Sequence, residues 1–72
     1  MRLEIICHDR VGMGQKVLGI FVEHGINVRG IELKQAGRIF INIPDLEFSD
    51  LQTFMPQLRL IAGVGDVRTA PF

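Results

Sequence analysis

Four consecutive residues, Asp9-Arg10-Val11-Gly12, stand directly before an apolar periodic segment and are the first candidates for chemistry. The N-terminus of a helix has free backbone N–H groups and the positive end of the helix dipole, so it can bind a carboxylate. Gly12 would let a ligand approach the backbone, and Asp9 could accept a hydrogen bond from an α-amino group. The stretch is therefore a candidate carboxylate-binding site. The alternative is an ordinary strand-to-helix turn in which Asp9 only caps the loop.

Asn27 is a second candidate, because its amide donates and accepts hydrogen bonds at once and therefore suits a zwitterion. It follows Gly25, so the alternative is an ordinary turn asparagine.

The residues of the chain do not indicate a metal site or a cofactor site. One cysteine, Cys7, and two distant histidines do not supply the ligand spacing of a metal site. The pair Gly12 and Gly14 begins like a dinucleotide fingerprint, but Val17 stands where the third glycine belongs. We therefore expect no metal and no cofactor.

Catalytic motifs are also missing, since no nucleophile–base pair and no P-loop occurs. Acylphosphatases use a loop arginine in a similar position to Arg10, but their loop is longer and richer in glycine and arginine. We expect a protein that is not an enzyme.

Composition narrows the class further. Seventy-two residues make one small domain of marginal stability, and 47% apolar residues favour burial against another copy or the rest of a longer chain. Eight basic residues balance eight acidic ones, so the electrostatic footprint of a nucleic-acid binder is missing. No membrane-spanning run or signal peptide is evident, and one cysteine fits a reducing compartment, so we expect a cytoplasmic location.

The first half of the chain changes its hydrophobic period from two to 3.6. Residues 2–8 alternate, which predicts a strand. From Met13 to His24 the apolar residues fall on one helical stripe, and Gly25 is a natural stop. Gly14 and Gly19 inside this helix indicate either close backbone approach or tolerated surface glycines.

A hairpin is predicted next. Residues 26–34 form a β-rich segment whose phase slips at Arg29-Gly30, which indicates a bulge. A glycine-bearing turn at 35–37 leads into a second strand over 38–43, which Pro44 ends.

A second helix and a last strand complete the chain. Ser49 and Gln52 form a capping box before a helical pattern that should stop at Gly63, with a kink or tightened segment near Pro56. Residues 65–70 form the last predicted strand.

The resulting order is strand, helix, strand, strand, helix, strand. It predicts an α+β, ferredoxin-like βαββαβ domain with a four-stranded antiparallel sheet and two helices on one face. Ile6 and Phe40 would point to the uncovered face, which predicts a partner there. Phe40 could also be the stacking residue of an RNA-binding sheet, but the basic and aromatic residues around such a site are missing.

These features resemble a known family. The strand, the Asp9–Gly12 turn and the helix ending in Gly25-Ile26-Asn27-Val28 are similar to an ACT domain. Over the whole chain the resemblance is to the N-terminal domains of TyrR-like transcriptional regulators of aromatic amino acid genes. The segments that carry it are Met1–Glu4 with Cys7, Asp9-Arg10, Arg29-Gly30-Ile31-Glu32, Gly37-Arg38-Ile39 and Ile61–Thr69.

The resemblance implies that residues 1–72 are one regulatory domain at the N-terminus of a longer regulator whose other parts bind DNA. ACT domains typically pair and bind amino acids at the pair interface, so a homodimer that binds phenylalanine, tyrosine or tryptophan is expected. Carried over by position, the ligand-binding residues are Asp9, Arg10, Val11, Gly12, Gly14 and Asn27. The alternative is a ligand-free interaction module that contacts the transcription machinery, such as RNA polymerase, through Arg10.

Overall fold

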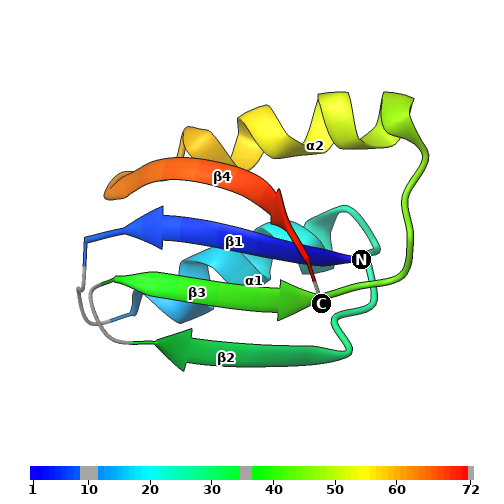
Figure 1. Cartoon of the computed structure of the whole chain (residues 1–72). Helices are drawn as coiled ribbons and strands as arrows, with labels where there is room; N and C mark the ends of the chain where they lie inside the picture. Colours follow the sequence, from blue (N-terminus) through cyan, green and yellow to red (C-terminus); the bar gives the residue numbers. More distant parts are fainter. Residues whose placement is uncertain (9–11, 35–36, 72) are drawn as a thin grey trace.

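The computed structural model describes residues 1–8, 12–34 and 37–71 and has the element order that the periodicity predicts (Figure 1). The elements are β1 (Arg2–Cys7), α1 (Met13–Glu23), β2 (Gly30–Lys34), β3 (Arg38–Asn42), α2 (Phe48–Arg59) and β4 (Val64–Ala70). The predicted βαββαβ order is confirmed.

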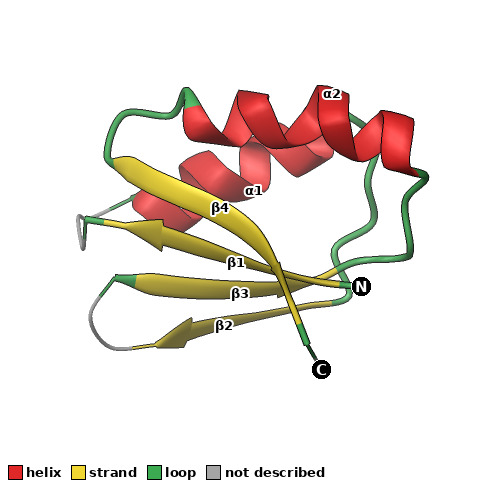
Figure 2. Cartoon of the chain, turned by 45° about the horizontal axis from the view of Figure 1, so that its top comes forward, coloured by secondary structure: helices red, strands yellow, loops and turns green. Residues whose placement is uncertain are grey.

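The four strands form one antiparallel sheet in the order β2-β3-β1-β4. β1 and β3 are central, while β2 and β4 are the edges. Both helices cover the same face of the sheet, as Figure 2 shows. This layering is the ferredoxin-like plan that the sequence predicts.

The core lies between the sheet and the two helices. Alternate residues of the strands face it, and α1 contributes one stripe at i, i+4 and i+8. The buried apolar residues are Leu3, Ile5, Met13, Val17, Phe21, Ile39, Ile41, Ile43, Phe54, Leu58 and Val67. The apolar residues of the strands, with a period of two, and those of the helix, with a period of 3.6, therefore both face the core.

The end of α1 is set by Gly25, as predicted. Gly25 has φ 68°, and its N–H donates to the Val22 carbonyl at 3.0 Å. The N–H of Ile26 donates to the Phe21 carbonyl at 2.9 Å. These two bonds form a Schellman motif, which requires the left-handed conformation that glycine adopts without strain.

The second strand is shorter than its sequence pattern predicts. It begins at Gly30 and pairs with β3 in continuous register to Lys34, so the bulge predicted at Arg29-Gly30 is wrong. Ile26 and Val28 belong instead to the connection after α1, where they pack against the core. The phase slip reflects a loop that buries apolar side chains before the strand starts. A register irregularity does occur in the sheet, between Ile6 and Cys7 opposite β4.

The start of α2 also differs from the prediction. Glu47, not Ser49, is the N-cap residue, and its carbonyl accepts from the Leu51 N–H at 3.0 Å. Ser49 therefore lies inside the first turn, where its carbonyl accepts from the Thr53 hydroxyl at 3.1 Å. The capping-box prediction is wrong because the first turn forms two residues earlier. The helix then runs continuously through Pro56 to Arg59.

The uncovered face of the sheet is more polar than the sequence pattern implies. Glu4 is 8% exposed and lies between Arg68 at 2.6 Å and Arg38 at 3.1 Å. The carboxylate of Glu4 raises the pKa of Arg68 above its ordinary value through a hydrogen bond and through its charge. Arg2 covers the ring of Phe40 at 4.2 Å. The strands thus cover much of this face with their own charged side chains.

Large exposed apolar side chains lie elsewhere, on the helices and on the edge strand β2. They are Val22, Ile31, Leu33, Phe48 and Leu60. A partner on the open sheet face stays a prediction, and these exposed side chains are further candidates for a contact surface. Over the described residues, neither helix is long and apolar enough to cross a membrane.

Candidate functional site

The N-terminus of α1 is built around Gly12. This residue is the N-cap, with φ 85°, and its carbonyl accepts from the Lys16 N–H at 3.1 Å. Among residues 12–34 and the other described parts of the chain, no side chain makes a capping hydrogen bond to this helix, and the first turn contains no acidic residue. The backbone N–H groups and the positive dipole end of α1 favour an anionic ligand there.

We expect the replacement Gly12→Ala to destabilise the domain by about 1–2 kcal/mol, because alanine resists the left-handed backbone conformation. A Cβ at Gly12 meets no atom within 4 Å, so strain and not collision is the cause. Urea unfolding would measure the change. Gly14→Ala is the matched control, since Gly14 lies inside the helix with open space around it and should gain up to about 1 kcal/mol. Equal effects of the two replacements would contradict this reading of Gly12.

A cavity of about 180 Å³ opens beside this helix end. It lies where β1 ends, α1 begins and the β2–β3 hairpin turns. Its lining residues are Cys7, His8, Gly12, Met13, Gly14, Leu33, Lys34, Gly37, Arg38 and Ile39. Leu33, Met13 and Ile39 give it apolar walls, and the helix end gives it a polar one.

Backbone hydrogen bonds hold the rim of this cavity. The Cys7 N–H donates to the Gly37 carbonyl at 2.8 Å, and the His8 N–H donates to the Gly63 carbonyl at 2.8 Å. Gly63 has φ 97°, and a Cβ placed on it would meet the end of the Met13 side chain at 2.5 Å. The turn after α2 therefore packs closely against the start of α1 and fixes the position of the helix end.

The predicted site residues divide into three groups. Gly12 and Gly14 line the cavity. Asp9, Arg10 and Val11 lie outside the described residues. Asn27 lies beyond the other end of α1, beside a second cavity. The 11 residues of α1 span about 16 Å, so a single chain does not bring Asn27 and Gly12 to one small ligand.

Five lining residues come from the hairpin and were not among the predicted site residues: Leu33, Lys34, Gly37, Arg38 and Ile39. Leu33 and Lys34 end β2, and Arg38 begins β3. The charged ends of Lys34 and Arg38 pair with Glu32 and Glu4, at 3.1 Å in both cases. The antiparallel pairing of β1 with β3 is the signal that could have found Arg38, because it places the start of β3 beside the end of β1.

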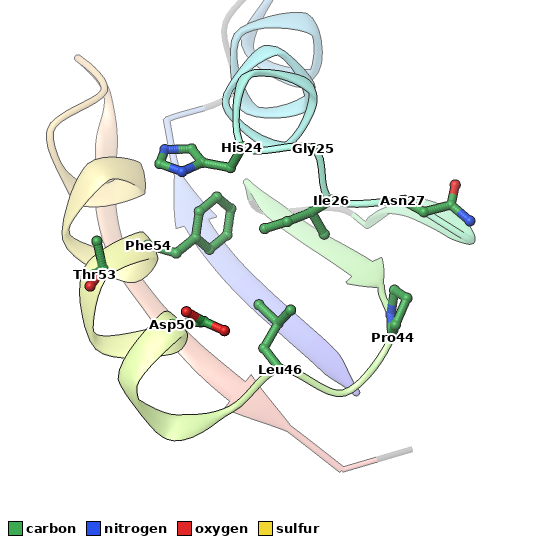
Figure 3. Close-up of a pocket in the computed structure, with 9 residues that line it drawn as sticks. All are labelled: His24, Gly25, Ile26, Asn27, Pro44, Leu46, Asp50, Thr53 and Phe54. Carbon is green, nitrogen blue, oxygen red and sulfur yellow. The ribbon is translucent and has the colours of Figure 1, made fainter.

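A larger cavity of about 490 Å³ lies at the C-terminal end of α1 (Figure 3). Its lining residues are His24, Gly25, Ile26, Asn27, Pro44, Leu46, Asp50, Thr53 and Phe54. Phe54 packs edge-on against Phe21 at 4.7 Å and against His24 at 5.2 Å between ring centroids. Among the described residues, no group of three histidine, cysteine or acidic side chains is placed to hold a metal ion.

Comparison with known proteins places this geometry in a family. The ACT domain family matches residues 1–59, which run from β1 to the end of α2. The chain belongs to the ACT-domain family.

Curated relatives of this ACT domain are transcriptional regulators. The chain is 46% identical over its 72 residues to the HTH-type transcriptional regulatory protein TyrR of Salmonella typhimurium, and 44% identical to that of Citrobacter braakii. The match spans the whole of this chain but only 14% of the length of each of these proteins. It is homologous to their N-terminal region.

Solved structures support the fold of the ACT domain independently. The crystal structure of the ACT domain from the GTP pyrophosphokinase of Chlorobium tepidum matches with a TM-score of 0.78 and 26% identity. The match covers 96% of this chain and 94% of that one.

Proposed function

We propose that this ACT domain is the amino-acid-sensing and dimerisation module of a TyrR-like transcriptional regulator, and that its ligand is phenylalanine, tyrosine or tryptophan. The observation that carries the proposal is the N-terminus of α1 at Gly12, which opens into a cavity with apolar walls. The backbone N–H groups after Gly12 would hold the ligand carboxylate, and Leu33 would contact its side chain.

The cavity is incomplete in one chain. Its volume of about 180 Å³ is below the roughly 300–1,000 Å³ of typical small-molecule sites. Asn27, whose amide suits an α-amino group, lies at the opposite end of α1. Both facts are explained if a second copy of the chain completes the site.

The edge of β2 offers the surface for that second copy. β2 is an edge strand, and Ile31 and Leu33 are exposed on its helix side. Gly14, Leu18 and Val22 follow one another at i, i+4 and i+8 along α1, and Gly14 lines the same cavity as Leu33. We take the exposed side chains of the strand edge and this helix row together as the apolar strip of the proposed interface.

Antiparallel pairing of two β2 edges across a two-fold axis would complete the cavity. Such pairing puts the beginning of each strand beside the end of its partner. Asn27 precedes β2, while Leu33 and Lys34 end it beside Gly12. The Asn27 of one protomer would thus approach the Gly12 cavity of the other, which supports a shared site with residues from both copies.

Sensing would follow from a population shift. A ligand held between two copies stabilises one relative arrangement of the protomers, and the attached domains respond to that arrangement. The domain itself would be neither an enzyme nor a DNA-binding unit; DNA would be bound elsewhere in a longer, cytoplasmic regulator. The preference for aromatic amino acids rests on the resemblance to TyrR-like regulators.

Calorimetry with L-phenylalanine, L-tyrosine and L-tryptophan tests the proposal. We expect saturable binding that weakens at least about tenfold in Gly14→Met, because the new side chain occupies the cavity. Gly19→Met is the matched control, since Gly19 is also helical with open space around it but does not line the cavity. Its affinity should stay within about twofold of the parent.

Two results would contradict the sensing role. One is the absence of heat and of any melting shift at millimolar ligand. The other is an equal loss of affinity in both glycine variants. Absence of binding from a chain that still dimerises would favour the alternative, a ligand-free module that contacts the transcription machinery.

A further inference from the structure

Within a single chain, the cavity at the C-terminal end of α1 and the Gly12 cavity lie at opposite ends of the helix. Asn27 borders the former cavity and is also the residue that the proposed dimer would bring to the partner's Gly12 cavity. It is formed by three segments: the turn after α1, the connection from β3 to α2, and the first two turns of α2. Its volume of about 490 Å³ is sufficient for a small organic molecule within a single chain.

The centre of this cavity is apolar. Figure 3 shows the side chains of Phe54, Ile26 and Leu46 turned toward one another around it. Phe54 is 2% exposed and is held by its ring contacts, while Ile26 and Leu46 are partly buried against the core. These side chains would contact a hydrocarbon body.

The charge around the cavity favours a cation. Asp50 turns its carboxylate toward the cavity (Figure 3) and makes no hydrogen bond or ion pair with the residues that the structure describes. No lysine or arginine is among the lining residues. The C-terminal end of α1 adds partial negative charge, and its last turn contains no basic residue. The N-terminal end of α2 adds partial positive charge, which the full charge of Asp50 in the first turn outweighs.

We propose that this cavity binds a small apolar amine, with the ammonium group at Asp50 and the hydrocarbon body against Phe54, Ile26 and Leu46. This ligand class differs from that of the Gly12 cavity. The helix N-terminus there favours a carboxylate, whereas a carboxylate at the second cavity would face Asp50 and the carbonyl end of α1. An amine without a carboxylate is therefore preferred over the corresponding amino acid.

An NMR titration of the ¹⁵N-labelled 72-residue chain with phenethylamine tests the proposal. We expect saturable shifts of the amides in residues 24–27 and 46–54, and little change at Gly12 and Gly14. Phenylacetate has the same ring with the opposite charge, and it should bind at least about tenfold more weakly at the same residues. This comparison of two ligands needs no substitution.

A matched pair of substitutions isolates the carboxylate. Asp50→Asn should weaken phenethylamine binding about three- to fivefold, the size expected for a solvent-exposed ion pair. Glu47→Gln removes the same charge three residues earlier, outside the lining of the cavity, and should change the affinity less than twofold. Equal binding of phenethylamine and phenylacetate, equal effects of the two substitutions, or shifts confined to the Gly12 end would each overturn the proposal.

Discussion

Replacing Leu33 with aspartate should convert the proposed dimer into monomers and abolish amino-acid binding, with little change in the fold of the single chain. Leu33 is 71% exposed on the edge strand β2, so a polar residue there costs the monomer little, within about 0.5 kcal/mol. Its side chain belongs to the apolar strip through which two β2 edges would pair.

The expected effect on association is large because two-fold symmetry introduces the substitution twice. Each new carboxylate would replace an apolar contact at the interface and would have to be desolvated when two β2 edges pair. Desolvation of a charge costs several kcal/mol, of which the other copy's Arg29, directly before β2, would offset a part, so the dissociation constant of the dimer should rise more than about tenfold. Light scattering coupled to size-exclusion chromatography measures the mass directly.

Leu60→Asp is the control. Leu60 is 79% exposed, next to the end of α2 and away from the β2 edge, so its replacement should leave the dimer and its ligand affinity unchanged. A dimer that survives Leu33→Asp but dissociates with Leu60→Asp would place the interface on α2 and would contradict the shared site.

The sequence predicts the βαββαβ order because each strand and each helix has its own hydrophobic period within a short stretch of residues. Alternation in residues 2–8 and the helical stripe from Met13 both report which side chains face the core. Gly25 ends α1 as predicted, because the left-handed conformation that it supplies is a local requirement of the helix end.

Element boundaries are less predictable where tertiary contacts decide them. Ile26 and Val28 have strand-like side chains, yet they pack against the core from a loop, and β2 begins only at Gly30. Ser49 and Gln52 fit a capping box, but α2 starts at Phe48, because its first turn forms around the Glu47 carbonyl. For α2, the local sequence permits a start at either position, and the packing of the whole helix selects the earlier one.

The candidate sites show the same division. Gly12 can be identified from the sequence, because a glycine directly before a helical pattern indicates a helix start that a ligand can approach. Leu33 and Arg38 reach the same cavity only through the pairing of β1, β3 and β2, which no local pattern specifies. Asp50 joins the second cavity because α2 crosses beside the end of α1, and this arrangement is a property of the assembled core.

The replacement Phe21→Ala should have the largest effect on stability. Phe21 is fully buried on α1, and its ring contacts the ring of Phe54 on α2 at 4.7 Å. Truncating a buried phenylalanine to alanine costs about 3–5 kcal/mol, because burial is lost and a cavity remains. A domain of 72 residues has a total stability of roughly 4–11 kcal/mol, so this one substitution removes a large part of it.

His24→Ala is the matched control for Phe21→Ala. His24 also lies at the α1 end and touches the Phe54 ring edge-on at 5.2 Å, but it is exposed. Its replacement should cost no more than about 1 kcal/mol, the size of one aromatic pair. Urea unfolding of both variants measures the difference.

Because Phe54 borders the second cavity, a folded Phe21→Ala chain should also lose phenethylamine binding, while the backbone bonds at Cys7 and His8 preserve the Gly12 cavity. A loss of stability below about 1 kcal/mol for Phe21→Ala would show that this ring does not join α1 to α2.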